Sequence, residues 1–275
     1  MTKKLANTII YALCDGLEGS PVNGTCKAPK AIIFDFDGTL STLRCGWEVV
    51  MRKLMGEILG EYITMEEIDR FIDESTGIQT IFQMKWIAEQ LEKRGIAPLD
   101  PWDYKAEYNR RLMLNIEDKK QALLSGACEK ETYLMAGSEE LLKMIKSHGI
   151  NIYVASGTDQ PDVQAEAAAL GLDKYFTEIA GAPLREEKCS KEAVLRRLIA
   201  QQDIPAENIL IVGDGKVEIA LGREAGARTL GVASNEKNRC GIDETKKKRL
   251  ENAGADRIIG DYRDIADLEA WIFCE

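Results

Sequence analysis

One ten-residue stretch constrains the fold of this chain more than any other, Ala31 to Leu40, which reads AIIFDFDGTL. Its first four residues form a short, bounded apolar run, which predicts a buried β-strand over residues 31–34. The strand runs directly into Asp35 and Asp37 and then a Gly-Thr turn. In an open α/β sheet, ligands bind just beyond the carboxyl ends of the strands. We therefore expect these carboxylates to begin a functional site.

The residues behind this strand change abruptly to helical periodicity. Apolar residues at three- and four-residue steps predict helices near residues 47–58, 65–72, 78–93 and 102–124. An all-helical block placed where one crossover would suffice predicts a separate small domain over the strand ends. We expect this helical cap at residues 44–132.

From Gly137 onward, predicted helices and strands alternate. The strands are expected at residues 150–155, 175–179, 208–212, 228–232 and 257–259. Alternation of this kind implies right-handed crossovers and a mostly parallel, doubly wound sheet. We predict an α/β fold with a Rossmann-like core at residues 30–43 and 133–275, a helical cap inserted after the first strand, and an N-terminal extension at residues 1–29.

Composition excludes several classes of protein. The net charge of −10 argues against a nucleic-acid partner, because binding a phosphate backbone needs a positive surface. There is no run of eighteen apolar residues, and Asp15 and Glu18 interrupt the place where a signal peptide would be apolar. The seven cysteines are scattered and never form a C-x-x-C pair, which is typical of reduced thiols. We expect a cytoplasmic protein with no membrane partner.

Polar residues follow three of the predicted strands at one edge of the sheet. In chain order they are Asp35 and Asp37, Ser156 and Gly157, and Asp214 and Glu218. Two carboxylates from different strands, Asp35 and Asp214, suit a hard ion such as Mg²⁺. A phosphoryl group fits among that ion, the Ser156 hydroxyl and the Lys191 ammonium, which is the arrangement that phosphoryl transfer requires.

The nucleophile is expected to be a carboxylate. His148 is the only histidine, and no reactive cysteine pattern lies near the strand ends. Asp35, beside the metal, would stay ionised and attack phosphorus to form an aspartyl-phosphate. Asp37 would protonate the leaving alcohol and later take a proton from the hydrolytic water.

These motifs resemble those of the haloacid dehalogenase superfamily of phosphohydrolases, of the capped phosphoglycolate phosphatase or β-phosphoglucomutase type. The likeness covers roughly residues 30–270 and rests on DFDGTL, on Ser156, on Lys191 23 residues before Asp214, and on the Gly-Asp-Gly-x-x-acid motif. It implies a Mg²⁺ cofactor, with Asp35 as nucleophile, Asp37 as acid/base, and Ser156, Gly157 and Lys191 around the phosphate. The metal set expected from it is Asp35, Asp37, Asp214 and Glu218.

Two features of the likeness need separate mention. The family's dehalogenases lack the second aspartate of the first motif. The presence of Asp37 therefore indicates a phosphate substrate and not a halide. Glu218 stands where the family more often has aspartate, and its longer side chain would hold the metal directly or through water.

Simpler explanations exist for several of these residues. Each Asp-Gly pair alone is a common tight turn, and Lys188 competes with Lys191 as the phosphate lysine. In the cap, helix packing and solvated faces account for the residues that could otherwise reach a substrate. Those residues are Arg44, Trp47, Gln79, Lys85, Trp86, Trp102, Arg110, Arg111 and the loop 75–79. Residues 246–249 are expected on the exposed face of a helix.

The sequence therefore predicts a Mg²⁺-dependent phosphatase for a small phosphorylated metabolite. A phosphomutase of the same fold, passing the phosphoryl group to a second hydroxyl of a sugar, has the same motifs. A binding protein that has lost turnover is the alternative from another class.

Overall fold

The protein is described here from a computed structural model, which covers residues 27–76, 78–183, 191–201 and 204–274. Most of the predicted N-terminal extension lies outside the described residues, as does Lys188. Within the described part, no helix is both long and apolar enough to cross a membrane.

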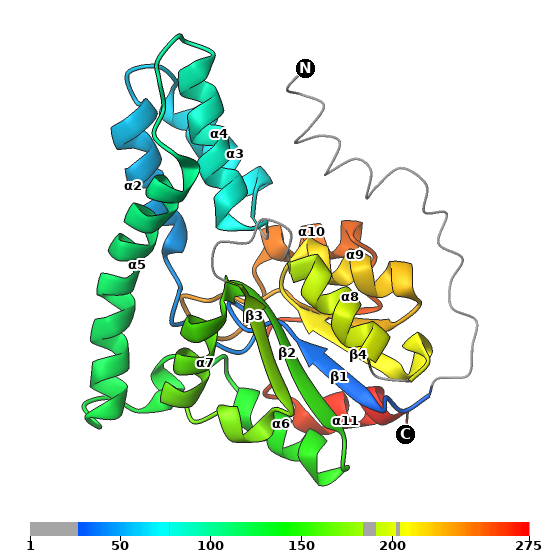
Figure 1. Ribbon diagram of the computed structural model, residues 1–275. Coiled ribbons are helices and arrows are strands. Elements are labelled where there is room, and N and C mark those ends of the chain that lie inside the picture. Colours follow the sequence, from blue (N-terminus) through cyan, green and yellow to red (C-terminus); the bar gives the residue numbers. More distant parts are fainter. Residues whose placement is uncertain (1–26, 77, 184–190, 202–203, 275) are drawn as a thin grey trace.

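The centre of the molecule is one sheet of six parallel strands in the order β3-β2-β1-β4-β5-β6 (Figure 1). The strands are β1 (Ala31–Phe34), β2 (Asn151–Asp159), β3 (Glu178–Ala182), β4 (Ile209–Gly213), β5 (Arg228–Val232) and β6 (Arg257–Ile259). β1 lies between β2 and β4, with Phe34 opposite both Val154 and Val212. The residues that follow β1 and β4 therefore emerge side by side at the same edge of the sheet.

Helices cover both faces of the sheet, as predicted for an α/β fold (Figure 1). α6 (Ser138–Ser147), α7 (Gln160–Ala169) and α11 (Ile265–Phe273) pack with Ile32 and Phe34, whereas α8 (Lys191–Gln201) and α9 (Lys216–Ala225) pack with Ala31 and Ile33. Successive residues of a strand point to opposite faces. Because both faces of β1 are buried, all four of its residues are apolar.

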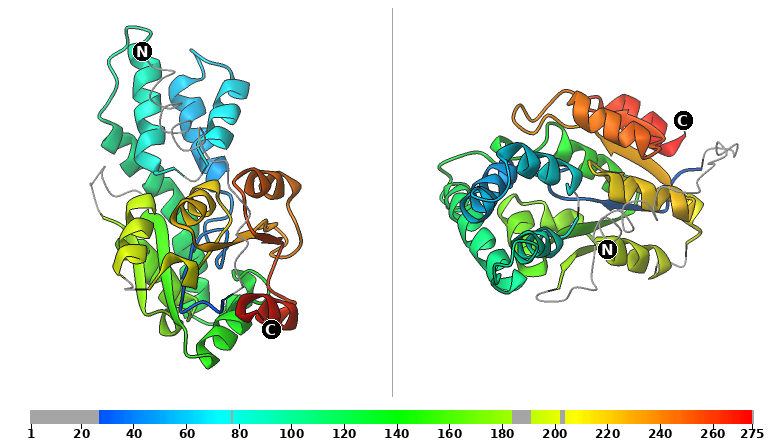
Figure 2. Two further views of the ribbon diagram at one scale, coloured as in Figure 1. Left: turned by 90° about the vertical axis from the view of Figure 1, so that its right-hand side faces the viewer. Right: turned by 90° about the horizontal axis from the view of Figure 1, so that it is seen from above.

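Four helices behind β1 form a separate layer, which stands at the end of the sheet where the strands terminate (Figures 1 and 2). They are α2 (Trp47–Leu59), α3 (Met65–Glu74), α4 (Thr80–Glu92) and α5 (Pro101–Leu124). They enclose their own apolar core, which includes Met51, Met84 and Ile116. Local sequence signals mark where two of these helices begin. Thr64 and Glu67 form a capping box for α3, and Asp100 caps α5, which begins at Pro101.

Some elements differ from the sequence-based expectation. Residues 173–175 form a 3₁₀ turn and β3 begins only at Glu178, because the Tyr175 hydroxyl turns inward to donate to Glu139 at 2.8 Å. β2 continues past residue 155 to Asp159, with a register shift against β3. α10 (Glu244–Asn252) contains the helix expected at residues 246–249, whereas α11 had not been predicted. Cys274 is disulfide-bonded, so the expectation of reduced thiols throughout is wrong at this cysteine, whereas Cys45, Cys128 and Cys240 are free.

Candidate active site

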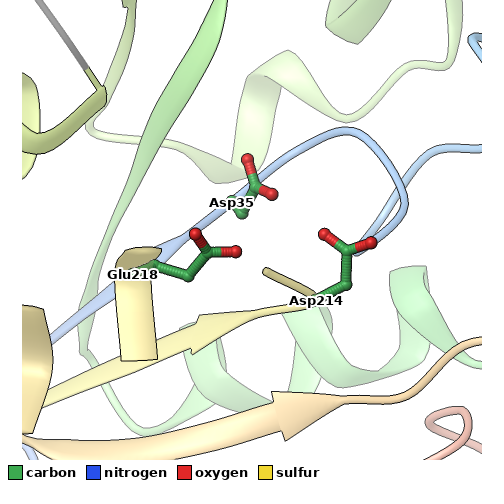
Figure 3. A group of neighbouring side chains, drawn as sticks. All are labelled: Asp35, Asp214 and Glu218. Carbon is green, nitrogen blue, oxygen red and sulfur yellow. The ribbon is translucent and has the colours of Figure 1, made fainter. Parts of the chain in front are cut away.

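Three carboxylates converge at the ends of β1 and β4 (Figure 3). Asp35 follows β1, Asp214 follows β4, and Glu218 lies in the first turn of α9. One oxygen from each lies within 4.8 Å of the others, and Asp35 and Glu218 are buried. Clustered carboxylate oxygens are the donors that Mg²⁺ accepts in proteins. The residues present therefore fit a Mg²⁺ ion, and Asp35 and Asp214 are close enough to share it.

Two glycines make room for these acids. Gly38 has φ +73°, and a Cβ there would lie 2.4 Å from Asp214 Oδ2. A Cβ on Gly213 would lie 2.3 Å from Cγ of Glu218, whose Oε1 accepts a hydrogen bond from the Gly215 N–H at 2.6 Å. The glycines of the DGT and GDG motifs thus let the carboxylates approach closely, beyond any role in turning the chain.

The Asp37 carboxylate is not one of the three acids in this group. Its Oδ2 accepts a hydrogen bond from Thr158 Oγ1 at 2.8 Å, and its Oδ1 lies 3.8 Å from Arg44 Nε. It lines the same cavity as Asp35 and Asp214. The two aspartates of the first motif therefore have different surroundings, which suits different chemical roles.

Arg44 is also bound by a buried acid, Glu166. The Glu166 carboxylate of α7 accepts from Arg44 Nη2 at 2.6 Å and from Nε at 3.1 Å, and Asp162 lies 3.6 Å from Nη2. Burial acts to lower the pKa of Arg44, but Asp37 and Glu166 outweigh it and raise that pKa. Burial raises the pKa of Glu166 to about 7 despite the arginine, and the nearby charge of Asp37 adds to this shift.

Ser156 and Gly157 both line the cavity at the end of β2. Ser156 is buried, and its Oγ accepts a hydrogen bond from the Thr158 N–H at 3.0 Å. The hydroxyl proton is then available to donate toward a phosphate. Lys191 is the first residue of α8, but its side chain lies outside the described part of the structure, so its phosphate role stays a prediction.

Lys246 is the functional residue that the sequence analysis missed. Its Nζ contacts Asp214 Oδ2 at 2.6 Å, Glu236 Oε1 at 2.6 Å and Ser234 Oγ at 3.1 Å. These three contacts match the three protons of an ammonium group. Burial acts to lower the pKa of Lys246, but Asp214 and Glu236 outweigh it and raise that pKa. The prediction that residues 246–249 lie on an exposed helix face is therefore wrong for Lys246. The sequence signal near it is Asp243, three residues earlier, which caps the start of α10.

A cavity of about 470 Å³ lies over the acids, between the sheet and the helices α2 to α5. Among the residues that could reach a substrate, Arg44, Trp47, Gln79 and Trp102 line it, as do Thr76 and Ile78 of the predicted loop. Lys105 of α5 reaches across to Asp159 at the end of β2, at 2.9 Å. This ion pair ties the helical layer to the sheet at the cavity wall.

Other residues proposed for the cap have structural roles. Trp86 stacks on Phe71 with ring centroids 3.9 Å apart, and Lys85 Nζ lies 5.4 Å from the Phe82 ring centroid. Arg110 and Arg111 both pair with Glu107 at 2.7 Å. For these four residues, helix packing and solvated faces are the better account.

The chain is also similar to known proteins in its sequence. A model of the family described as haloacid dehalogenase-like hydrolase matches residues 32–232. The chain is similar to a phosphoglycolate phosphatase of Rhodospirillum rubrum, at 25% identity over 198 residues, which is 72% of this chain and 77% of that protein.

Solved structures share the fold. A predicted phosphoglycolate phosphatase from Haemophilus somnus matches with a TM-score of 0.59 at 18% identity, covering 87% of this chain and 97% of that one. A β-phosphoglucomutase from Clostridium difficile matches with a TM-score of 0.56 at 17% identity, covering 88% and 96%. Both are similar in architecture, including helices beside a parallel sheet.

Proposed function

This chain belongs to the haloacid dehalogenase-like hydrolase family as a phosphatase, and from that premise we propose that it hydrolyses phosphate monoesters of a small metabolite through an aspartyl-phosphate on Asp35. The observation that carries the proposal is the convergence of Asp35, Asp214 and Glu218 within 4.8 Å beneath a cavity of about 470 Å³. A separate carboxylate, Asp37, lies beside this group in the same cavity.

Each side chain has a role in the proposed reaction. Mg²⁺ bound by Asp35, Asp214 and Glu218, with Asp37 as a further predicted ligand, would screen the charge of the phosphate. An Asp35 oxygen attacks phosphorus while the bond from phosphorus to the ester oxygen breaks. Asp37 donates its proton to the departing alcohol oxygen and later accepts one from water, which hydrolyses the acyl-phosphate. Ser156, Gly157 and Lys191 are proposed to hold the phosphate oxygens.

The lining of the cavity indicates which kind of substrate could bind. On the side formed by the helical layer, Gln79, Thr76 and Asn109 offer hydrogen-bonding groups, and Trp47 and Trp102 offer apolar surface. Such a mixture suits a small hydroxylated metabolite. Closure of the helical layer over the strand ends would exclude bulk water until the phosphoryl group has been transferred.

The test is hydrolysis of p-nitrophenyl phosphate, followed by a phosphate-release screen across sugar phosphates, nucleotides and phosphorylated acids. Activity is expected to require Mg²⁺ and to vanish in Asp35→Asn, because an amide cannot attack phosphorus. Asp118→Asn, on the outer helix α5, is the matched control and should retain activity. Full activity of Asp35→Asn would contradict the proposal.

Phosphomutase activity is the second candidate, favoured by the shared fold with the β-phosphoglucomutase of Clostridium difficile. In that reaction the phosphoryl group on Asp35 passes to a second sugar hydroxyl instead of to water. Isomerisation of a sugar phosphate without release of inorganic phosphate would establish it. Tight binding of a phosphate ester with neither product would instead support the non-catalytic alternative.

A further inference from the structure

Tyr108 of α5 is a buried tyrosine whose hydroxyl has no hydrogen-bond partner among the described residues. The residue is only 4% exposed. Buried tyrosine hydroxyls usually find a partner inside the protein. Other buried tyrosines of this chain have partners within 3.1 Å, namely Tyr104, Tyr175 and Tyr262. The polar end of Tyr108 is therefore left for a group that comes from outside the protein.

Tyr108 reaches the cavity above the candidate metal site. Its ring packs in the apolar core of the helical layer, and the residue also lines the cavity, as does Leu112 one turn later on α5. The charges that act on its hydroxyl belong to Arg44, Glu48 and Asp37, which line the same cavity. The hydroxyl is thus presented to a molecule that enters there.

The Tyr108 hydroxyl stays protonated at neutral pH. Burial raises the pKa of Tyr108 above that of an ordinary tyrosine, and the charges of Glu48 and Asp37 add to this shift, against the opposing charge of Arg44. A protonated phenol can both donate and accept a hydrogen bond. It can therefore pair with an alcohol hydroxyl in either direction.

The charges around Tyr108 favour an uncharged ligand group. The carboxylates of Glu48 and Asp37 would repel a carboxylate or a second phosphate on the substrate. Arg44 offers little compensation, because its Nη2 lies 2.6 Å from Glu166 and its Nε lies 3.8 Å from Asp37. An alcohol hydroxyl meets no such repulsion, so it is the group that suits this part of the cavity.

We propose that Tyr108 is a specificity-determining residue that hydrogen-bonds a hydroxyl group on the alcohol part of the substrate. This inference rests on the proposed function and narrows the substrate to a phosphate ester of a diol, a polyol or a sugar. Binding such a group breaks no hydrogen bond that Tyr108 makes within the described part of the protein. An ester without the hydroxyl would cover the phenol without satisfying it, which is unfavourable.

The experiment compares three esters that differ by one hydroxyl group: propyl phosphate, racemic 2-hydroxypropyl phosphate and 3-hydroxypropyl phosphate. Phosphate release in saturating Mg²⁺ gives kcat/KM for wild-type protein and for Tyr108→Phe, which removes only the hydroxyl group. The wild-type protein should prefer at least one hydroxylated ester over propyl phosphate by about tenfold, the contribution of one well-formed hydrogen bond. Tyr108→Phe should lose that preference and keep the wild-type activity on propyl phosphate.

Tyr104→Phe is the matched control. Tyr104 lies one turn earlier on α5, and its hydroxyl accepts from the Leu99 N–H at 3.0 Å. This variant should keep the wild-type preference and lower the unfolding midpoint, because it loses an internal hydrogen bond. Tyr108→Phe should leave the midpoint unchanged or raise it. A lower midpoint for Tyr108→Phe would mean that its hydroxyl has a partner within the protein, which would overturn the inference.

The kinetic outcomes separate this inference from the proposed function. A wild-type protein with no preference among the esters, a preference that survives in Tyr108→Phe, or an equal loss for all three esters in that variant would overturn the role of Tyr108 while leaving the phosphatase intact. Absence of Asp35-dependent hydrolysis of these esters and of p-nitrophenyl phosphate by the wild-type protein would overturn the proposed function and this inference together.

Discussion

Lys246 Nζ lies 2.6 Å from Asp214 Oδ2, although the two residues are 32 positions apart and belong to different helix-strand units. The same ammonium contacts Glu236 and Ser234, and Ser234 Oγ donates to the Gly38 carbonyl oxygen at 2.5 Å. Asp214 is thereby held through Oδ2, while its Oδ1 accepts from Thr39 Oγ1 at 3.4 Å. Helix α10 therefore supplies a side chain that holds one carboxylate of the candidate metal site.

Removing this cation is expected to destabilise the protein in a metal-dependent way. Lys246→Met leaves Asp214 and Glu236 without their shared counter-ion, at a cost of about 3 kcal/mol in the free energy of unfolding. Mg²⁺ would replace part of the lost charge at Asp214. Thermal unfolding in EDTA and in Mg²⁺ should show a larger deficit in EDTA. Lys247→Met, its more exposed neighbour, should change neither, and an equal deficit in both conditions would contradict the account.

Gly38→Ala is expected to abolish most activity. The left-handed backbone alone costs roughly 1–2 kcal/mol with a side chain. The new Cβ would also meet Asp214 Oδ2 at 2.4 Å, so the carboxylate proposed to bind the metal must move. Initial rates with p-nitrophenyl phosphate measure the effect.

Gly126→Ala is the matched control for that substitution. Gly126 has φ +71°, close to the +73° of Gly38, but nothing lies within 4 Å of its Cβ position. It should lose similar stability and retain activity. Equal loss of activity in both variants would show that backbone strain, and not displacement of Asp214, is responsible.

Glu166 is expected to make stability depend on pH. Burial raises its pKa in the folded protein to about 7, from the 4.5 of an ordinary glutamate side chain. A carboxyl group whose folded pKa is raised contributes stability that is fully present below about pH 4.5 and is lost as the pH rises through about 7. Since one pKa unit corresponds to about 1.4 kcal/mol, the change is on the order of 3 kcal/mol.

Urea unfolding at pH 5 and pH 8 tests this prediction. Wild-type protein should lose more stability between the two pH values than Glu166→Gln, in which this group no longer titrates. The difference between the two proteins removes the contribution of every other titrating group. An identical change in both would mean that Glu166 stays ionised throughout.

Glu218→Gln is expected to raise the Mg²⁺ concentration needed for half-maximal activity by about tenfold, because an amide is a weaker ligand than a carboxylate. The amide oxygen can still accept from the Gly215 N–H, so folding should be preserved. Mg²⁺ titrations of activity measure the shift. Glu224→Gln, farther along α9 and 44% exposed, should leave the Mg²⁺ dependence unchanged.

Local patterns in the sequence predicted most of the fold. A strand buried on both faces, such as β1, appears as a continuous apolar run, and its end is marked where polarity begins at Asp35. β5 begins and ends at the predicted residues for the same reason. The start of β3 was wrong because Tyr175 has strand-like composition but turns into the core to reach Glu139.

The sequence alone determined the residue types at the strand ends, and parallel strand topology determined that Asp35 and Asp214 would meet. Only the tertiary structure decided that Lys246 lies against Asp214, that Thr158 holds Asp37 and that Glu166 clamps Arg44. The physical reason is the separation in sequence between the residues that interact. Strand and helix patterns are set by neighbours a few residues away, whereas these contacts join residues 32 to 122 positions apart, brought together by burial of apolar faces elsewhere.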